Sequence, residues 1–472
     1  MTSLPFPCFV KDTPVDANNN RAALTAVGRC RLDPATCFDS TDYRAICAKN
    51  REQALVDDTD ANNNKEENKK LKKKYMKQGV AMASKYLQET LQLDVSIVDV
   101  QMVVSNNDIV ETDGCLAACL LDAGCAAIVM DGTNLEAMDA AKIPRERLVA
   151  HFVGEEVATT DAIAAALPLA GTISVGLSST RSLDTVDNIL KLVPDKKDKV
   201  SFIVPTTGED GEELYQFVSE VSKRCKDGKG SIGLVDPTPT SLGLSFAACM
   251  KTDRPDGLFT TVVCTRSDEA LGLVYSSKES IIAALECGRG VYYSRSRNSL
   301  WRKGDTSGHY QSLHRLDVDC DGDALRFIVT QRGDDTAAFC HLDTLTCWGE
   351  PRGLRHLEAT LQDRLKSAPA GSYTKRLFED PVLLRDKLVE EAQELSEATD
   401  PQDVAGELAD VLYFAMVRAA KAGVSIDDAI AELDRRTRKV TRRQGDSKAF
   451  RISAGDAILG KSNANTTTDT GN

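Results

Sequence analysis

The sequence has few aromatic residues, few histidines and no long run of apolar residues. Only 5% of its 472 residues are Phe, Trp or Tyr, and two of these are Trp. The chain has five His. No apolar run approaches the roughly 18 residues that a membrane-spanning helix needs, so no membrane association is expected. The opening MTSLPFPCFV has no basic start and is interrupted by Pro5, Pro7 and Lys11, so it does not resemble a secretory signal peptide.

An excess of positive charge is also absent. The 58 Lys and Arg are outnumbered by 71 Asp and Glu, which leaves a formal net charge of −13. This balance argues against binding to nucleic acid through bulk charge, although a phosphorylated substrate could still bind through a bridging metal. The 14 Cys are too sparse for a disulfide scaffold of this length. The sequence therefore predicts a soluble, cytoplasmic protein with mostly free thiols, a few of which could be metal ligands.

The length and the changes of pattern along the chain predict about three domains. Residues 1–79 show weak periodicity and include the polar stretch 57–78, so a poorly structured segment with a charged linker is expected. In residues 80–250, β-rich runs such as CAAIVM and TISVGL alternate with amphipathic segments, which predicts an α/β domain of unknown role with a parallel sheet. The remaining expected segments are a strand-rich region at 251–353, a helical region at 354–452 and a disordered tail at 453–472.

Aspartates alternate in the string DCDGD of the strand-rich region. In an extended strand, Asp319, Asp321 and Asp323 would point to one face and could hold a hard cation such as Mg²⁺. Cys320 would then point to the opposite face. The alternative is a solvated turn or a structural Ca²⁺ loop.

Two further cysteines follow this string. Cys340 and Cys347 would bring the number of thiols to three with Cys320, and three thiolates with one open position suit a catalytic Zn²⁺. His341 adjoins one of these ligands and could move a proton. The spacing is not a C-x-x-C pattern, so generic zinc-ribbon reasoning does not apply.

The sequence around these residues resembles the phosphoribosyl-AMP cyclohydrolase family, which catalyses the third step of histidine biosynthesis. The motifs SRSR, LW-x-KG, TSGH-x-Q, DCD-x-DAL and CH ahead of a second Cys occur in order between residues 288 and 350. The resemblance implies that zinc is bound by Cys320, Cys340 and Cys347, that Mg²⁺ is bound by Asp319, Asp321 and Asp323, and that the substrate-facing loop contains Trp301, Lys303, Gly304, Ser307, Gly308 and His309.

The chemistry that this family implies agrees with these residue types. Zinc-bound hydroxide would attack C6 of the adenine ring, and the N1–C6 bond would break, in parallel with attack at C6 in the zinc deaminases. Arg295, Arg297 and Lys303 are candidate phosphate partners, and their alternative is ordinary surface charge. A zinc nucleobase deaminase is a poorer interpretation, because the H-x-E…P-C-x-x-C pattern is missing.

A second group of carboxylates lies in the helical region. On a helix, Glu390 and Glu391 both neighbour Glu394, and Glu407 and Asp410 form another pair three residues apart. Two such helices facing each other could hold Mg²⁺, which would bind a polyphosphate. The alternative is a solvated Glu-rich face.

The order EE-x-x-E, then E-x-x-D, is similar to the all-α nucleoside-triphosphate pyrophosphohydrolases. With SYTKRLF before it and KVTRRQGD after it, the segment resembles phosphoribosyl-ATP pyrophosphatase, the second step of the same pathway. The resemblance implies Mg²⁺ ligation by Glu391, Glu394, Glu407 and Asp410, with Glu390 in or beside the cluster. Arg442 and Arg443 could hold phosphate, or could complement the dipole of a helix C-terminus.

The two resemblances predict one bifunctional hydrolase that converts phosphoribosyl-ATP to phosphoribosyl-AMP and then opens the adenine ring, with Zn²⁺ and Mg²⁺ as cofactors and a homodimeric assembly. The expected fold is multidomain, with an α/β domain that loosely resembles half of a phosphate-binding βα barrel, a β-rich α+β domain and an all-α domain. The α/β region is expected to be dispensable for both chemistries, and the histidinol dehydrogenase of the fungal-type fusions is expected to be absent. The alternative is a non-catalytic metal-binding scaffold or regulatory subunit of the pathway.

Overall fold

The computed structural model describes residues 7–11, 29–32, 65–90, 95, 98–112, 114–179, 182–193, 199–206, 211–225, 230–235, 237–333, 337–349, 352–441, 453–455 and 457–458. The chain divides into two compact units. The first comprises Met1–Trp348 and Asp434–Thr441, and the second comprises Gly349–Leu433 and Arg442–Asn472. Most of the expected disordered tail, 459–472, lies outside the described residues.

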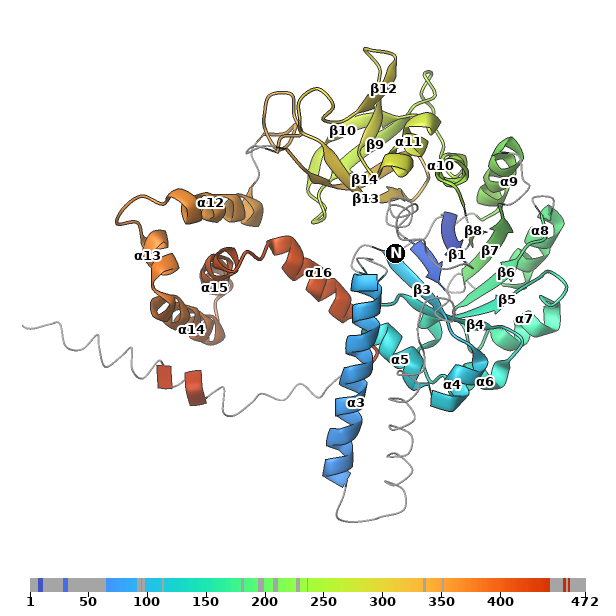
Figure 1. Cartoon of the computed structure of the whole chain (residues 1–472), viewed down its shortest axis with the longest axis horizontal. Coiled ribbons are helices and arrows are strands. Elements are labelled where there is room, and N and C mark those ends of the chain that lie inside the picture. Colours follow the sequence, from blue (N-terminus) through green and yellow to red (C-terminus); the bar gives the residue numbers. More distant parts are fainter. Residues whose placement is uncertain are drawn as a thin grey trace, which may run out of the picture. The chain divides into compact units, whose positions relative to one another are not determined.

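Eight parallel strands form a closed barrel in the first unit, in chain order (Figure 1). They are β1 (Pro7–Lys11), β2 (Arg29–Leu32), β3 (Asp99–Val103), β4 (Ala127–Asp131), β5 (Leu148–Phe152), β6 (Thr172–Gly176), β7 (Lys199–Pro205) and β8 (Gly230–Val235). β1 pairs with both β2 and β8, which closes the ring. The α/β prediction is confirmed, but the barrel is complete rather than half, because β1 and β2 come from the weakly periodic N-terminal segment.

Helices alternate with the strands and cover the outside of the barrel (Figure 1). They are α3 (Lys65–Lys85) with the π-helical turn Tyr86–Thr90, α4 (Asn106–Thr112), α5 (Cys115–Asp122), α6 (Leu135–Ala140), the 3-10 turn Arg145–Arg147, α7 (Thr160–Ala166), α8 (Leu183–Leu192), α9 (Gly211–Arg224) and α10 (Pro239–Ala248). α3 includes the second half of the stretch 57–78 that was expected as a charged linker. Lys and Glu are good helix formers, and Ala83 near the end of α3 is fully buried in the core.

The barrel encloses a layer of polar side chains. The guanidinium of Arg31, a residue that is 2% exposed, donates to Gln101 Oε1 and to Ser174 Oγ, the latter at 3.0 Å. His151 Nδ1 lies 3.0 Å from the same Ser174 hydroxyl. Burial and the charge of Arg31 lower the pKa of His151 to about 4, so its imidazole is neutral at pH 7. The interior is therefore filled by a hydrogen-bonded network as well as by apolar side chains.

The strand-rich region of the first unit is a four-stranded sheet in the order β10-β9-β14-β13 with a separate hairpin, β11-β12. The elements are β9 (Phe259–Cys264), β10 (Ala270–Ser276), α11 (Lys278–Cys287), β11 (Val291–Ser294), β12 (Ser299–Arg302), β13 (Gln311–Val318) and β14 (Ala324–Gln331). β9 and β14 are parallel and the other pairs are antiparallel. The predicted β-rich α+β architecture is confirmed.

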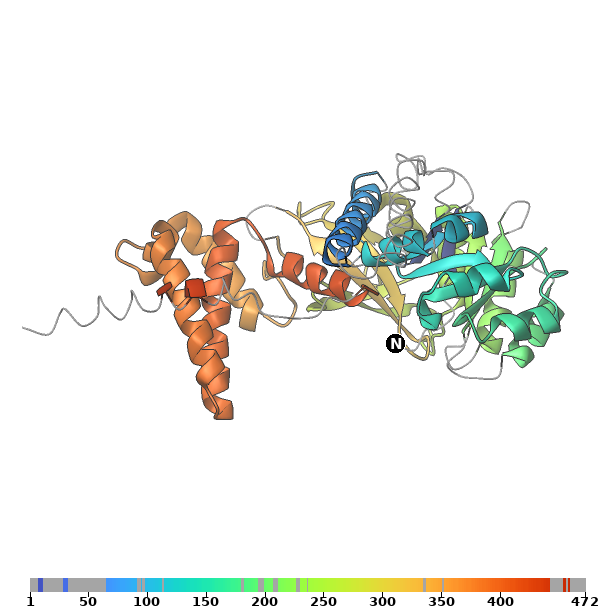
Figure 2. The same cartoon turned by 90° about the horizontal axis from the view of Figure 1, so that it is seen from below.

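The second unit is helical, as predicted (Figure 2, orange). Its helices are α12 (Gly353–Ser367), α13 (Tyr373–Glu379), α14 (Pro381–Glu397), α15 (Pro401–Lys421) and the first part of α16 (Ile426–Thr437). The core is formed by Leu361, Leu377, Phe378, Leu384, Phe414, Met416 and Val417. Across the described part of the chain, no helix combines the length and the apolar character needed to cross a bilayer.

Candidate functional site

The DCDGD string forms the turn between β13 and β14 and is not an extended strand. Asp319 Oδ1 accepts hydrogen bonds from the backbone N–H groups of Gly322, Asp323 and Ala324 at 3.0–3.1 Å. Gly322 has a φ of +88°, a conformation that residues with a Cβ rarely adopt. The predicted alternation on a strand is therefore wrong, because the aspartate and glycine in the string build a tight turn.

The turn nevertheless brings three carboxylates together. Asp319, Asp321 and Asp323 each offer one oxygen, and these oxygens lie within 4.8 Å of one another. A hydrogen bond from Asp323 to Asp319, together with the negative charge there, raises the pKa of Asp323. Burial raises the pKa of Asp319, but the N–H of Ala324 and the two neighbouring carboxyl groups outweigh it and lower that pKa. This mutual repulsion is what a bound divalent cation would relieve.

Cys340 and Cys347 form a pair of neighbouring thiols. Cys340 is 7% exposed, and its interaction with the thiol of Cys347 contributes to the lowering of its pKa. A hydrogen bond from the N–H of Leu342 lowers the pKa of Cys340, whereas partial burial and the nearby Cys340 raise the pKa of Cys347. One thiol is thus biased toward the thiolate form that zinc requires, and the other lies beside it.

A close approach of the backbone positions this pair. A Cβ at Gly272 on β10 would lie 2.2 Å from Phe339 Cε1 and 3.0 Å from Cys347 Sγ, so only glycine leaves room. The N–H of Cys347 donates to Leu271 O at 2.8 Å, which ties the end of the loop to the same strand. The β-sheet therefore supports both cysteines directly.

Cys320 does not join the pair within one chain. It is exposed on the β13–β14 turn. The clusters of three metal-ligating side chains found among the described residues consist of carboxylates, and neither contains a cysteine. A three-thiolate zinc site is therefore incomplete in the single chain.

The ammonium of Lys303 lies beside the cysteine pair and not at the surface. The residue is 5% exposed, and Nζ donates to Ala338 O at 3.4 Å. Burial lowers the pKa of Lys303, and the nearby Cys347 and Cys340 oppose this shift. Lys303 therefore lies next to the two cysteines, and its predicted contact with phosphate stays a prediction.

In the second unit, three glutamates converge between α14 and α15. One carboxylate oxygen from each of Glu391, Glu394 and Glu407 lies within 4.8 Å of the others. Burial and repulsion from Glu391, Glu407 and Glu390 raise the pKa of Glu394. Glu407 Oε2 is buried without a hydrogen-bond partner. A buried acceptor that lacks a donor, in a group of like charges, is suited to Mg²⁺.

A lysine on α14 partly neutralises this cluster. Lys387 Nζ contacts Glu391 Oε1 at 2.7 Å and Glu390 Oε2 at 2.9 Å. Glu390 therefore lies beside the cluster as a partner of Lys387, and Asp410 lies one turn beyond Glu407 on α15, outside the group of three. Neither Glu390 nor Asp410 belongs to the group of three carboxylates that the fold brings together.

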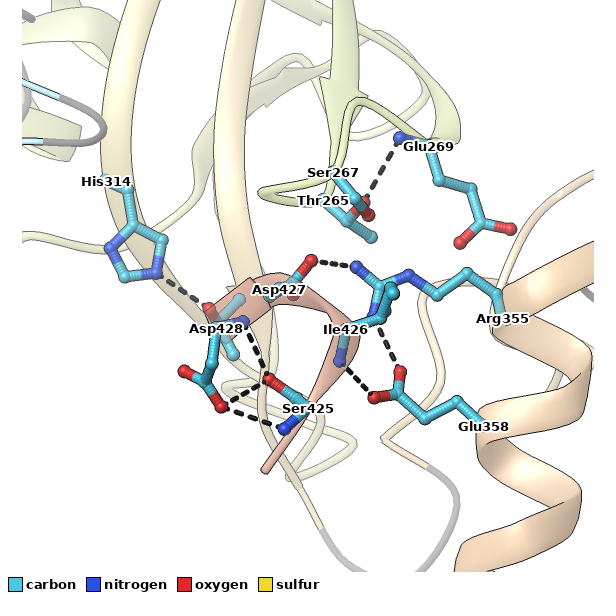
Figure 3. Close-up of polar contacts among 11 residues, drawn as sticks. Thr265, Ser267, Glu269, His314, Arg355, Glu358, Ser425, Ile426, Asp427 and Asp428 are labelled. Carbon is cyan, nitrogen blue, oxygen red and sulfur yellow. Dashed lines mark hydrogen bonds and ion pairs between the residues drawn. The ribbon is translucent and has the colours of Figure 1, made fainter. Parts of the chain in front are cut away.

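The helical frame around the cluster is fixed by local capping and ion pairs. Asp400 caps α15 by accepting from the N–H of Gln402 at 2.8 Å, and Pro401 occupies the first helical position. At the other side of the unit, Arg355 on α12 pairs with Asp427, and Glu358 accepts from Arg355 and from the N–H of Ile426 (Figure 3). These contacts hold the start of α16 against α12.

Comparison with known proteins places the two clusters in two matched families. Residues 272–349 match the family Phosphoribosyl-AMP cyclohydrolase, and residues 354–437 match Phosphoribosyl-ATP pyrophosphohydrolase. The Histidine biosynthesis bifunctional protein HisIE of Pyrococcus furiosus is 32% identical over 199 residues, which are 39% of this chain and 93% of that protein. The chain belongs to this family of bifunctional histidine-biosynthesis proteins.

Fungal relatives of the bifunctional family are more similar but longer. The Histidine biosynthesis bifunctional protein his7 of Schizosaccharomyces pombe is 53% identical over 213 residues, which are 45% of this chain and 50% of that protein. A Histidine biosynthesis trifunctional protein of Kluyveromyces lactis is 54% identical over 205 residues, 43% of this chain and 26% of that protein. The chain therefore spans between about a quarter and a half of the length of these fungal relatives.

Most of the other predicted residues of the cyclohydrolase region lie in or beside the β11–β12 hairpin and the loop that follows it, whereas His341 directly follows Cys340 after β14. The guanidinium of Arg295 lies 4.0 Å from the ring centroid of Tyr275. His309 Nδ1 is buried without a hydrogen-bond partner. The remaining positions are Arg297, Ser307, Gly308 and His341, which are exposed, and Trp301 and Gly304, which are partly buried. Arg442 and Arg443 of the pyrophosphohydrolase region lie outside the described residues.

Sequence reasoning missed a buried chain of hydrogen bonds behind Cys340. Tyr292 Oη donates to Gln311 Oε1 at 2.6 Å, Gln311 Nε2 donates to Gln331 Oε1 at 3.0 Å, and Gln331 Nε2 donates to Ala338 O at 3.1 Å. Ala338 is also the acceptor for Lys303. The only signal in the sequence was Gln311 itself, which ends the TSGH-x-Q motif.

Replacing Gln331 by leucine is expected to weaken the cyclohydrolase site selectively. The variant removes one hydrogen-bond partner each from Ala338 O and Gln311, which should lower the free energy of unfolding by about 1–3 kcal/mol. It also releases the segment that leads into Cys340. We expect cyclohydrolase turnover and zinc content to fall while pyrophosphate release stays unchanged. Gln362→Leu, at an exposed position on α12, is the matched control; equal losses in both variants would contradict this role.

Proposed function

We propose that the chain hydrolyses phosphoribosyl-ATP to phosphoribosyl-AMP and pyrophosphate at the helical site, and then opens the adenine ring of phosphoribosyl-AMP at the β-rich site. The observation that carries this proposal is that each family match encloses clustered side chains with the required donors. The cyclohydrolase match contains the Cys340–Cys347 pair, and the pyrophosphohydrolase match contains the Glu391, Glu394 and Glu407 cluster.

At the β-rich site, the soft thiols fit zinc and the DCDGD carboxylates fit Mg²⁺. When bound, zinc supplies a water molecule acidified to a pKa of about 7 for attack at adenine C6. Cys340 and Cys347 would hold the metal. His341 Nδ1, 3.8 Å from Cys340 Sγ, is placed to carry a proton beside it. Lys303 would balance the charge of the thiolates from the buried side.

Because Cys320 lies apart from the pair, we propose that the active protein is a homodimer in which a second copy supplies the third thiolate. An isologous interface would then build two equal zinc sites from two chains. In the part of the chain whose side chains the structure describes, 11 cysteines are free, which supports a reducing compartment such as the cytoplasm.

At the helical site, Mg²⁺ when bound would neutralise the polyphosphate and orient it for attack by water. Glu391 and Glu407 supply buried or half-buried oxygens, and Glu394 supplies a more exposed one. Lys387 holds Glu391 in place through its ion pair. Glu390, Asp410, Arg442 and Arg443 are proposed as additional contacts to the ion or the phosphates.

The test is turnover of phosphoribosyl-ATP by the full chain with both metals present. We expect pyrophosphate and phosphoribosyl-AMP to appear first and the ring-opened product to follow. Chromatography of the nucleotides at successive times measures this order. Failure to consume phosphoribosyl-ATP, or failure to open added phosphoribosyl-AMP, would reject the corresponding half of the proposal.

A further inference from the structure

A short segment from the C-terminal part of the chain lies on the barrel. Residues Asp434–Thr441, here called the strap, belong to the same unit as the barrel, although the residues before them belong to the second unit. The strap comprises the last turn of α16 and the four residues that follow it. Part of it lies within the pyrophosphohydrolase match, which ends at residue 437.

Arg438 of the strap bonds to the start of two barrel strands. Its Nη1 donates to Val98 O at 3.2 Å and to Gly124 O at 3.1 Å, and its Nη2 contacts Asp99 Oδ1 at 2.7 Å. Val98 and Asp99 lie at the beginning of β3, and Gly124 precedes β4. The guanidinium therefore binds at the amino-terminal face of the barrel.

Arg147 of the barrel makes the reciprocal contact. Its Nη1 donates to Arg438 O at 2.9 Å, while Nε and Nη2 donate to Ala126 O and Cys125 O, both at 2.6 Å. The Arg438 guanidinium thus binds backbone carbonyls of the barrel, and the Arg147 guanidinium binds a backbone carbonyl of the strap. Two neighbouring arginines repel, and burial together with Arg438 lowers the pKa of Arg147. Two neighbouring, partly buried arginines are stable only where well-oriented hydrogen bonds offset their repulsion.

Asp122 completes the contact at the end of α5. This residue is 6% exposed, and its Oδ1 accepts from the backbone N–H groups of Val440 at 2.9 Å and Thr441 at 3.1 Å. The side chain of Val440 packs against the core of the first unit. If the strap left, the buried Asp122 carboxylate would lose the hydrogen bonds from Val440 and Thr441, which is unfavourable in a low-dielectric environment.

At the carboxyl-terminal face of the barrel, acidic residues bind the loops of the barrel itself. Asp131, at the end of β4, accepts from the N–H and hydroxyl of Thr133 in its own turn. Glu155, after β5, accepts from the hydroxyls of Ser178, Ser182 and Thr185. Both carboxylates thus hold loops in place at the face where βα barrels carry their chemistry, whereas the amino-terminal face of such barrels serves stability.

We propose that the barrel is an anchoring module whose amino-terminal face binds the strap, and that it thereby fixes the C-terminal end of the pyrophosphohydrolase region. The partner is a segment of this same chain, recognised by its Arg438 guanidinium and by two consecutive backbone N–H groups. This role is independent of the proposed catalytic activities, since none of the contacting residues belongs to either metal site.

Hydrogen–deuterium exchange of the full chain tests the anchoring directly. The amides of Val440 and Thr441 are expected to be protected, and Arg438→Ala is expected to speed their exchange by about tenfold or more. Arg436→Ala, which removes an exposed arginine of the same helix end, should leave the exchange unchanged. Far-UV circular dichroism of each variant checks that the barrel remains folded.

A second variant changes the barrel side of the contact. Asp122→Ala removes the acceptor for both amides and should speed the same exchange even though the strap sequence is intact. Protection lost in Arg438→Ala and Asp122→Ala but kept in Arg436→Ala supports the anchor. Unprotected strap amides in the unaltered protein, or equal exchange in all three variants, overturns it.

Discussion

Replacing Cys340 by serine is expected to abolish ring opening of phosphoribosyl-AMP while pyrophosphate release from phosphoribosyl-ATP continues at its normal rate. The Cys340 thiol receives N–H hydrogen bonds that lower its pKa, and it contacts the thiol of Cys347, so its removal takes away the better zinc ligand of the pair. We expect cyclohydrolase turnover to fall more than about a hundredfold, together with the zinc content. Separate assays with each substrate, with zinc measured by mass spectrometry, check both effects.

Cys287→Ser is the matched control, because Cys287 ends α11 in the same unit and lies outside the site. It should retain both activities. A Cys340→Ser protein that opens phosphoribosyl-AMP normally would remove the zinc assignment. Loss of pyrophosphate release as well would show that the substitution disturbs the whole chain.

The same variant tests the shared site. If Cys320 comes from a second copy, mixing Cys340→Ser and Cys320→Ser proteins should restore about a quarter of the activity, because half of the dimers are mixed and each has one intact site of two. Two inactive variants that stay inactive after unfolding and refolding together would favour a site built within one chain.

Replacing Glu394 by glutamine is expected to stop pyrophosphate release while added phosphoribosyl-AMP is still opened. The substitution keeps the size of the side chain but removes one of the three carboxylates within 4.8 Å of one another. We expect turnover of phosphoribosyl-ATP to fall more than about a hundredfold, and high Mg²⁺ concentrations should not restore it fully. Gln393→Glu, at the neighbouring exposed position, is a control for charge on the helix and should remain active.

The raised pKa of Glu394 provides a second measurement, which distinguishes loss of a metal ligand from damage to the fold. Its pKa is raised in the folded state by burial and by Glu391, Glu407 and Glu390, so the folded state binds the proton more tightly than the unfolded state. Its ionisation therefore destabilises the metal-free fold as the pH rises through the raised value. Glu394→Gln should unfold no earlier than the unaltered chain in a chelator at pH 7; marked destabilisation would contradict a ligand role.

Local spacing predicted the helical site better than the β-rich site. Glu391 and Glu394 share a face because they are three residues apart on one helix. Glu407 lies close to Glu391 and Glu394 because α14 and α15 pack against each other. The hypothesis of two facing helices predicted this packing. The separation of Asp410 from the other three carboxylates depends on that packing in detail and could not be predicted.

The β-rich site shows where pattern reasoning failed. The alternation of Asp319, Asp321 and Asp323 suggested a strand, but Gly322 and the three N–H groups bound by Asp319 produce a turn. A glycine within the string was an available signal for it. The separation of Cys320 from the other cysteines is a matter of tertiary structure, and no spacing in the sequence reveals it.

The closed barrel and the strap could not be predicted from the sequence, for a different reason. β1 and β2 have five and four residues, and their place is set by pairing with strands far along the chain. The contact between Arg147 and Arg438 joins residues 291 positions apart. Contacts of such separation follow from the closed fold and leave no periodic trace in the sequence.

If two separate metal sites of this protein act in succession, removal of zinc alone should stop the second reaction and spare the first. The full chain is given phosphoribosyl-ATP and Mg²⁺ after treatment with a zinc-selective chelator, and all nucleotides are separated by chromatography. We expect phosphoribosyl-AMP to accumulate with an equal amount of pyrophosphate, and we expect the protein to convert it to the ring-opened product once zinc is added. Unhindered ring opening by the zinc-free protein, or an arrest before any pyrophosphate is released, would contradict this expectation.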